Sequence, residues 1–186
     1  MEQGTLSTKR MDISTQKMLG GIGTILILSV WLPAIGWLLG IVGLILLFVS
    51  MYKLSDMLKK PSIFKKFLIG FILMVINLLI AIVFGFAAFV SAFFAKDALT
   101  GIGLGTIGFF IVLYVVNVIS HYLYKQAFET LALATGQNLF KIAGLLMFIG
   151  ALTTIVFGLG GLLILIGYIL LAVAFFIAPK EVDVEV

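Results

Sequence analysis

The sequence predicts an all-α integral membrane protein: a six-helix transmembrane bundle built around two similar helical hairpins, 18–52 and 142–178, with both termini in the cytoplasm. Three observations predict this fold. Hydrophobic residues make up 63% of the chain and charged residues 11%, against about 45–50% and 25% in soluble proteins. Long stretches carry no charge, and the cations gather at the ends of those stretches.

The closing stretch, Ile142 to Pro179, is too long for one membrane helix and long enough for two short ones. It holds 38 residues without a formal charge, whereas roughly 20 apolar helical residues cross a bilayer core. Glycines at 158, 160 and 161 supply a turn near its middle, because glycine accepts the backbone angles of tight turns. We therefore predict helices over 139–157 and 161–178.

The first uncharged stretch, Met18 to Tyr52, is also predicted to form two helices joined by a turn. Pro33 and Gly36 break it near its middle, and the only two tryptophans of the chain flank the break. Tryptophan favours the membrane–water interface, so the break is expected to lie there. We predict helices over 18–32 and 36–60, the second leaving the membrane as an amphipathic extension that Pro61 stops.

The two hairpins also align with each other without a gap at an offset of 124 residues, which predicts a parallel internal repeat. The matched positions are Lys17 with Lys141, Gly20 with Gly144, Gly36 with Gly160 and Gly43 with Gly167.

Between the hairpins we predict two longer helices, 63–95 and 102–135. Small residues recur at helical spacing on the first of them, among them Ala88 and Ala92, and on the preceding helix at Gly36, Gly40 and Gly43. Such stripes allow helix backbones to approach closely in lipid. We expect the stripe on 36–60 to pack near the stripe on 63–95.

The chain divides into a polar, loosely ordered N-terminal tail (1–17), a single transmembrane domain (18–179) and an acidic C-terminal tail (180–186). Eleven of the twelve cations fall on one side of the predicted membrane and Lys96 alone on the other. Positive charge favours the cytoplasmic side, which gives six spans with both termini inside. The bias disfavours five spans with the first stretch as one helix, and it leaves open whether the two hairpins cross fully or are re-entrant.

A candidate polar cluster lies on the predicted fourth helix. Tyr114, Asn117 and His121 share one face, and Asn77 of the third helix is within their reach. One hypothesis is a polar lining for a solute path. The other, which we favour, is hydrogen bonding between helices, since lipid cannot solvate amides.

The chain offers little for catalysis. No charged side chain lies inside the apolar stretches, there is one histidine, and there is no cysteine. We therefore predict no enzyme activity, no catalytic residue, no cofactor and no metal site. The favoured function is a structural or interaction module, or an accessory subunit, of the cell membrane. The alternative is a facilitator or channel for a small solute. Expected partners are the lipid bilayer and a second copy or another membrane protein, with no nucleic acid.

Several stretches resemble the DUF996 group of uncharacterised, mainly archaeal membrane proteins. They are LGGIGTILIL (19–28), KLSDMLKKPSIFKKFLIGFIL (53–73), TGQNLFKIAGLLMFIGALTTI (135–155) and YILLAVAFF (168–176). The resemblance implies a polytopic membrane protein without an assigned activity, and it assigns no functional residue to this sequence.

Overall fold

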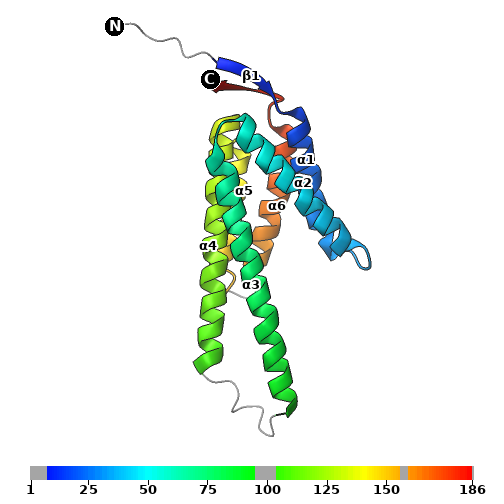
Figure 1. Cartoon of the computed structure of the whole chain (residues 1–186), viewed down its shortest axis with the longest axis vertical. Coiled ribbons are helices and arrows are strands. Elements are labelled where there is room, and N and C mark those ends of the chain that lie inside the picture. Colours follow the sequence, from blue (N-terminus) through cyan, green and yellow to red (C-terminus); the bar gives the residue numbers. More distant parts are fainter. Residues whose placement is uncertain (1–7, 95–103, 156–158, 186) are drawn as a thin grey trace, which may run out of the picture.

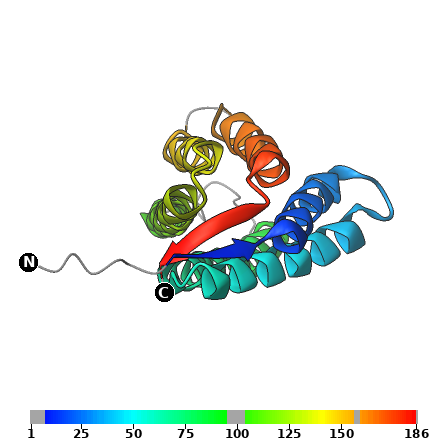
Figure 2. The same ribbon diagram turned by 90° about the horizontal axis from the view of Figure 1, so that it is seen from above.

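The structure, a computed structural model, describes residues 8–94, 104–155 and 159–185, and the side chains of 8–87, 108–155 and 159–184. Its described residues form six α-helices arranged as a ring in chain order, which α1 and α6 close (Figures 1 and 2). The predicted all-α six-helix membrane bundle is confirmed. The helices are α1 (Ser14–Leu28), α2 (Gly36–Met57), α3 (Pro61–Phe94), α4 (Leu104–Thr135), α5 (Leu139–Leu152) and α6 (Leu159–Ile177).

Four of these helices, α2, α3, α4 and α6, are long and apolar enough to cross a membrane. Helices α1 and α5 have 15 and 14 residues, about 21–23 Å, which is less than the roughly 30 Å of a hydrocarbon core. A complete crossing by these two stays a prediction.

Helix α5 ends five residues before its predicted end at 157, because two threonine hydroxyls compete for its last carbonyls. Thr153 Oγ1 donates to Ile149 O at 2.9 Å, and Thr154 Oγ1 donates to Gly150 O at 2.9 Å. Hydroxyls that bond to the preceding turn offer the backbone an alternative to the helix. At the start of the chain, α1 begins at Ser14 and ends at Leu28, followed by the 3₁₀ turn η1 (Ser29–Trp31).

The N-terminal tail, which was expected to be loosely ordered, has regular structure over most of its described residues, 8–17. Strand β1 (Thr8–Asp12) pairs with strand β2 (Glu181–Glu185) in an antiparallel sheet that lies across one end of the bundle (Figure 2). The reason is the alternation in the C-terminal segment: Val182 and Val184 are buried, whereas Glu181 and Asp183 are exposed. A period of two is the pattern of a half-buried strand.

Further bonds hold the two strands together and link β1 to the start of α1. Ile13 N–H donates to Lys180 O at 2.8 Å, and Arg10 lies 3.6 Å from the carboxylates of both Glu181 and Asp183. The hydroxyl and the N–H of Ser14 donate to Asp12, and these bonds lower the pKa of that carboxyl group. The described segments nearest the two termini, β1 and β2, therefore lie at the same end of the bundle, which is incompatible with five spans.

Glycines bring the two helices of each hairpin into close contact. A Cβ added to Gly43 would lie 2.7 Å from Ile27 N on α1, and a Cβ added to Gly167 would lie 3.2 Å from Met147 N on α5. The glycine stripe of α2 thus faces α1 and not α3, as had been expected. Ala88 and Ala92, the other half of that expectation, lie outside the residues with described side chains.

The packing partners of these two glycines also correspond at the offset of 124. Gly43 packs beside Gly23, and Gly167 packs beside Met147, which is 124 residues after Gly23. The internal repeat itself stays a prediction.

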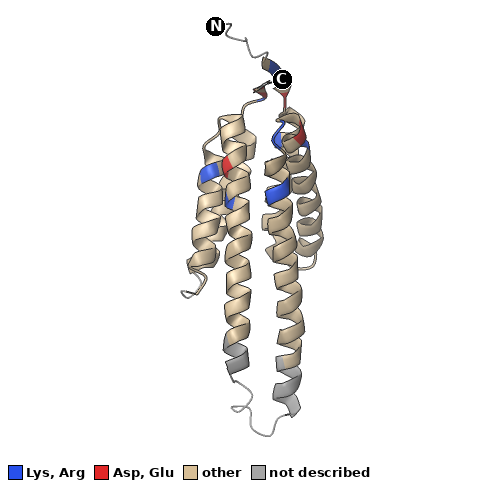
Figure 3. Cartoon of the chain, turned by 60° about the vertical axis from the view of Figure 1, so that its left-hand side comes forward, with Lys and Arg blue, Asp and Glu red and all other residues tan. Residues whose placement is uncertain are grey.

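The core lies in the half of the bundle next to the sheet. The largest fully buried side chains include Phe128, Phe140 and Phe175, all toward that end, where the described charged residues also gather (Figure 3). Helices α3 and α4 extend beyond both hairpins (Figure 1). Along this extension apolar side chains such as Phe86 are exposed, 68% in that case. Lys96, the one cation predicted on the opposite side, lies outside the described residues.

Candidate functional site

Among the described residues, no hydrogen bond joins the side chains of the predicted polar cluster to one another. Asn77 lies on α3, and Tyr114, Asn117 and His121 lie on α4. Tyr114 Oη donates to Leu152 O, at the end of α5, at 2.9 Å. This hydrogen bond joins α4 to α5, and it does not involve the other three residues of the cluster.

His121 is buried and bonded within its own helix. Its Nδ1 lies 2.9 Å from Asn117 O, one turn earlier, and its ring stands perpendicular to the ring of Tyr124 at a centroid distance of 5.8 Å. Because the Asn117 carbonyl can only accept, Nδ1 carries the proton in this contact. His121 thus meets the backbone of Asn117, and no bond from the histidine to the Asn117 amide is found among the described residues.

Asn77 differs from the other three residues because its side-chain oxygen, Oδ1, is buried and has no hydrogen-bond partner among the described residues. An unpaired buried carbonyl costs about 1–3 kcal/mol. This oxygen is the feature of the predicted cluster that calls for an additional donor.

The polar groups that do join helices are mostly hydroxyls bonded to backbone carbonyls. Ser120 Oγ of α4 donates to Gly70 O of α3, and Ser50 Oγ of α2 donates to Gln16 O of α1 at 2.7 Å. Lys17 Nζ, at the start of α1, donates to Ala178 O after α6. Sequence reasoning did not single out Ser120, Ser50 or Gly70, because a lone serine or glycine in an apolar helix carries no pattern.

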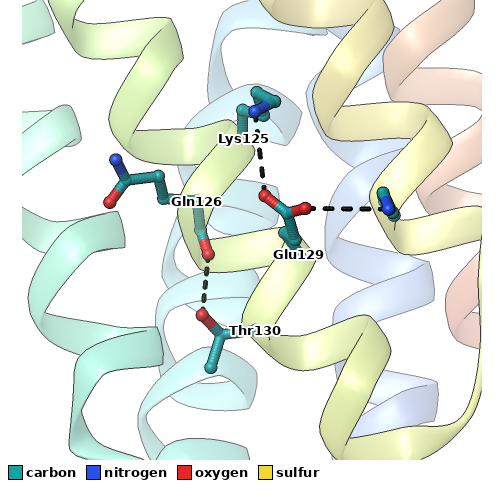
Figure 4. A network of polar contacts seen from close by, with 5 residues as sticks. Lys125, Gln126, Glu129 and Thr130 are labelled. Atoms are coloured by element: carbon teal, nitrogen blue, oxygen red, sulfur yellow. Dashed lines mark hydrogen bonds and ion pairs between the residues drawn. The ribbon is translucent and has the colours of Figure 1, made fainter.

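An ion-pair network joins α4 to α5 near the charged end (Figure 4). One carboxylate, that of Glu129, lies 3.7 Å from Lys125 Nζ on its own helix and 3.7 Å from Lys141 Nζ on α5. In the same turn Thr130 Oγ1 donates to Gln126 O at 2.8 Å. The Glu129 carboxylate thus links α4 to α5, and partly exposed ion pairs of this kind contribute about 0–1 kcal/mol.

The centre of the bundle contains a small apolar cavity of about 70 Å³, lined among others by Phe67, Met74, Tyr124 and Tyr168. A larger apolar groove of about 500 Å³ opens between α1 and α6, where Trp31 and Leu162 lie. None of the four residues of the predicted cluster lines either of them. Among the described residues there is also no group of three or more histidine, aspartate or glutamate side chains placed to hold a metal ion.

Fold and interior together define the class: a multi-pass helical membrane protein. In the part of the chain that the structure describes, its helices are joined mainly by hydroxyl-to-carbonyl bonds and by one ion-pair network. The chain belongs to the family described as "Protein of unknown function (DUF996)", whose model matches residues 39–169. It is also 36% identical, over 178 residues, to an uncharacterised protein of the archaeon Methanocaldococcus jannaschii; the alignment covers 95% of this chain and 98% of that protein. No solved structure matches the chain. The family resemblance seen in the sequence is confirmed.

Proposed function

We propose that the protein is a non-catalytic structural or interaction module of the cell membrane. The observation that carries this proposal is the set of hydrogen-bond partners of its polar side chains. The hydroxyls of Ser50, Ser120 and Tyr114 each donate to a backbone carbonyl of a neighbouring helix. Groups bonded in this way hold helices together in lipid. They are not available to replace the hydration shell of a solute, as the lining of a pore must.

The projecting part of α3 and α4 supports an interaction role. Beyond the two hairpins these helices present exposed apolar side chains, including Ile82, Val83 and Phe110. Phe84 and Phe109 stack across the helix pair at 4.6 Å, which keeps the pair together as one surface. A second copy of the chain or another membrane protein would pack on this surface.

One observation favours the alternative, a facilitator for a small solute. The unpaired Oδ1 of Asn77 would accept a hydrogen bond from a passing hydroxyl or amide group. In that case Asn117, on the facing helix, is the neighbouring candidate to line the path.

Liposome swelling with small neutral solutes decides between the two functions. We expect the wild-type protein to swell liposomes no faster than protein-free liposomes do. We also expect Asn117→Leu to change stability in detergent by about 1 kcal/mol, the scale of one hydrogen bond between membrane helices.

Val115→Leu is the matched control, because Val115 is on the same helix with its side chain exposed. Swelling that wild type and Val115→Leu support and that Asn117→Leu abolishes, with the fold intact, would replace the module by the facilitator.

A further inference from the structure

A groove of about 460 Å³ runs between α2 and α3 at the charged end of the bundle. Its inner wall is formed by Tyr52, Phe64 and Leu68. The rings of Tyr52 and Phe64 meet edge to face at a centroid distance of 5.2 Å, so this wall is a packed aromatic surface. Leu68 directly follows Phe67, where the uncharged stretch of α3 begins. The groove therefore leads from the polar end of the bundle to membrane depth.

The mouth of the groove is basic. Lys59 in the α2–α3 turn and Lys65 on α3 both line it, and both are exposed. Neither forms an ion pair with any acid in the described part of the chain, including Asp56, which lines the same groove. Two lysines and one aspartate give the mouth a net charge of +1, and both ammonium groups are free to take an anion.

Lys59 also occupies a backbone position that usually belongs to glycine. Its φ is 55°, in the left-handed region. Its N–H donates to Asp56 O at 3.1 Å and the N–H of Lys60 donates to Ser55 O at 3.0 Å, which is the Schellman end of a helix. At the same end of the bundle α4 is followed by Gly136, with a φ of 69°. A lysine is disfavoured where glycine serves the matching turn, and strained positions of this kind are found at binding sites more often than elsewhere.

We propose that this groove binds the phosphate headgroup of an anionic membrane lipid. Lys59 and Lys65 hold the phosphate, the Tyr52 hydroxyl lies at headgroup level, and the first carbons of a lipid chain follow Phe64 and Leu68. Basic pockets between membrane helices are suited to such headgroups, and each lysine near an anionic surface adds to the attraction. A free phosphate ion would satisfy the lysines alone and would leave the aromatic wall unused.

Lipid binding to the purified full-length protein in an uncharged detergent tests this proposal. Phosphatidylglycerol and phosphatidylcholine with the same acyl chains are compared by native mass spectrometry, with inorganic phosphate as a third ligand. We expect phosphatidylglycerol to bind about tenfold more tightly than phosphatidylcholine. The variant Lys59→Gln/Lys65→Gln is expected to remove that preference.

The matched control is Lys53→Gln/Lys60→Gln. It removes the same charge from the same end of the bundle at two exposed lysines, one on α2 and one in the α2–α3 turn, that do not line the groove. It is expected to keep the preference within about twofold. An equal loss in both variants would mean diffuse attraction to a basic surface. Phosphate binding as tight as that of the lipid would mean an ion site. Equal binding of the two lipids would mean no headgroup recognition. Each of these results overturns the proposal.

The variant Lys59→Gly distinguishes the effect of the lysine side chain on lipid binding from the effect of its backbone conformation on stability. Glycine relieves the left-handed conformation, so the melting temperature without added lipid is expected to rise by about 2 °C. Phosphatidylglycerol binding is expected to fall in the same variant. A Lys59→Gly protein that binds phosphatidylglycerol as the wild type does would remove Lys59 from the site and contradict the assignment.

Discussion

Replacing Gly43 with alanine is expected to destabilise the bundle by about 1–3 kcal/mol, the scale of overpacking in a closely packed core. The added methyl group would lie 2.7 Å from Ile27 N and 2.7 Å from Leu26 Cβ. Because Ile27 N is backbone, the neighbour cannot turn away, and α1 and α2 must separate. Unfolding of the purified protein in mixed micelles, followed by circular dichroism, measures the change in free energy.

Gly85→Ala is the matched control for this substitution. Gly85 also lies inside a long helix, α3, but a Cβ there meets no atom within 4 Å. Alanine is a better helix former than glycine by about 1 kcal/mol, so this variant is expected to be as stable as the wild type or more stable. Equal effects at the two positions would show that the close contact between α1 and α2 does not hold the hairpin together.

Phe175→Ala is expected to cost about 3–5 kcal/mol, the range for a large aromatic side chain removed from a packed interior. Phe175 is fully buried on α6, lies against Gly20 of α1, and meets Phe140 of α5 edge to face at 4.9 Å. It therefore joins the two hairpins. The same unfolding experiment measures the loss.

Phe86→Ala serves as the control, because Phe86 is 68% exposed on the projecting part of α3. Lipid is as apolar as the interior of the bundle, so an exposed phenylalanine gains little from its position and its removal is expected to cost less than 1 kcal/mol. If both variants lost the same free energy, membrane burial rather than packing between the hairpins would be the source of stability.

The helices could be predicted from the sequence because their cause is local. An uncharged stretch in a bilayer must satisfy its own backbone hydrogen bonds, and a helix does so within one segment. The break at Pro33 follows from a single residue with a restricted backbone angle, and Pro33 lies in an observed connection. The end of α5 was missed, since it depends on which carbonyls Thr153 and Thr154 reach.

The sheet and the contacts between helices could not be predicted from the sequence, because they depend on residues far apart in the chain. The VDVEV segment alternates as a strand does, yet a strand needs a partner, and β1 lies at the other end of the sequence. The face on which Gly43 packs is likewise set by the hairpin turn. Gly70, which no pattern singled out, lies against Ser120 and Tyr124 of α4.

In the candidate site, too, local features could be predicted from the sequence and contacts between distant residues could not. The sequence places Tyr114 and His121 on one helical face but does not show which groups each side chain reaches. In the structure Tyr114 bonds to the end of α5 and His121 to its own helix. The groove between α2 and α3 was missed although its lysines are plain in the sequence. Lys59 and Lys65 meet at the mouth of the groove because of the left-handed backbone conformation at Lys59. The lysines in the sequence do not predict that conformation.

Single-cysteine labelling tests the central claim most directly: a membrane bundle with its charged end and both termini in the cytoplasm, and the α3–α4 connection outside. The chain has no cysteine of its own, so Ser7→Cys, Ser62→Cys and Thr100→Cys each report one position. With an impermeant thiol reagent on intact cells, we expect labelling at position 100 alone, and labelling at all three after the cells are opened. Labelling of intact cells at positions 7 and 62, with position 100 protected, would contradict the orientation.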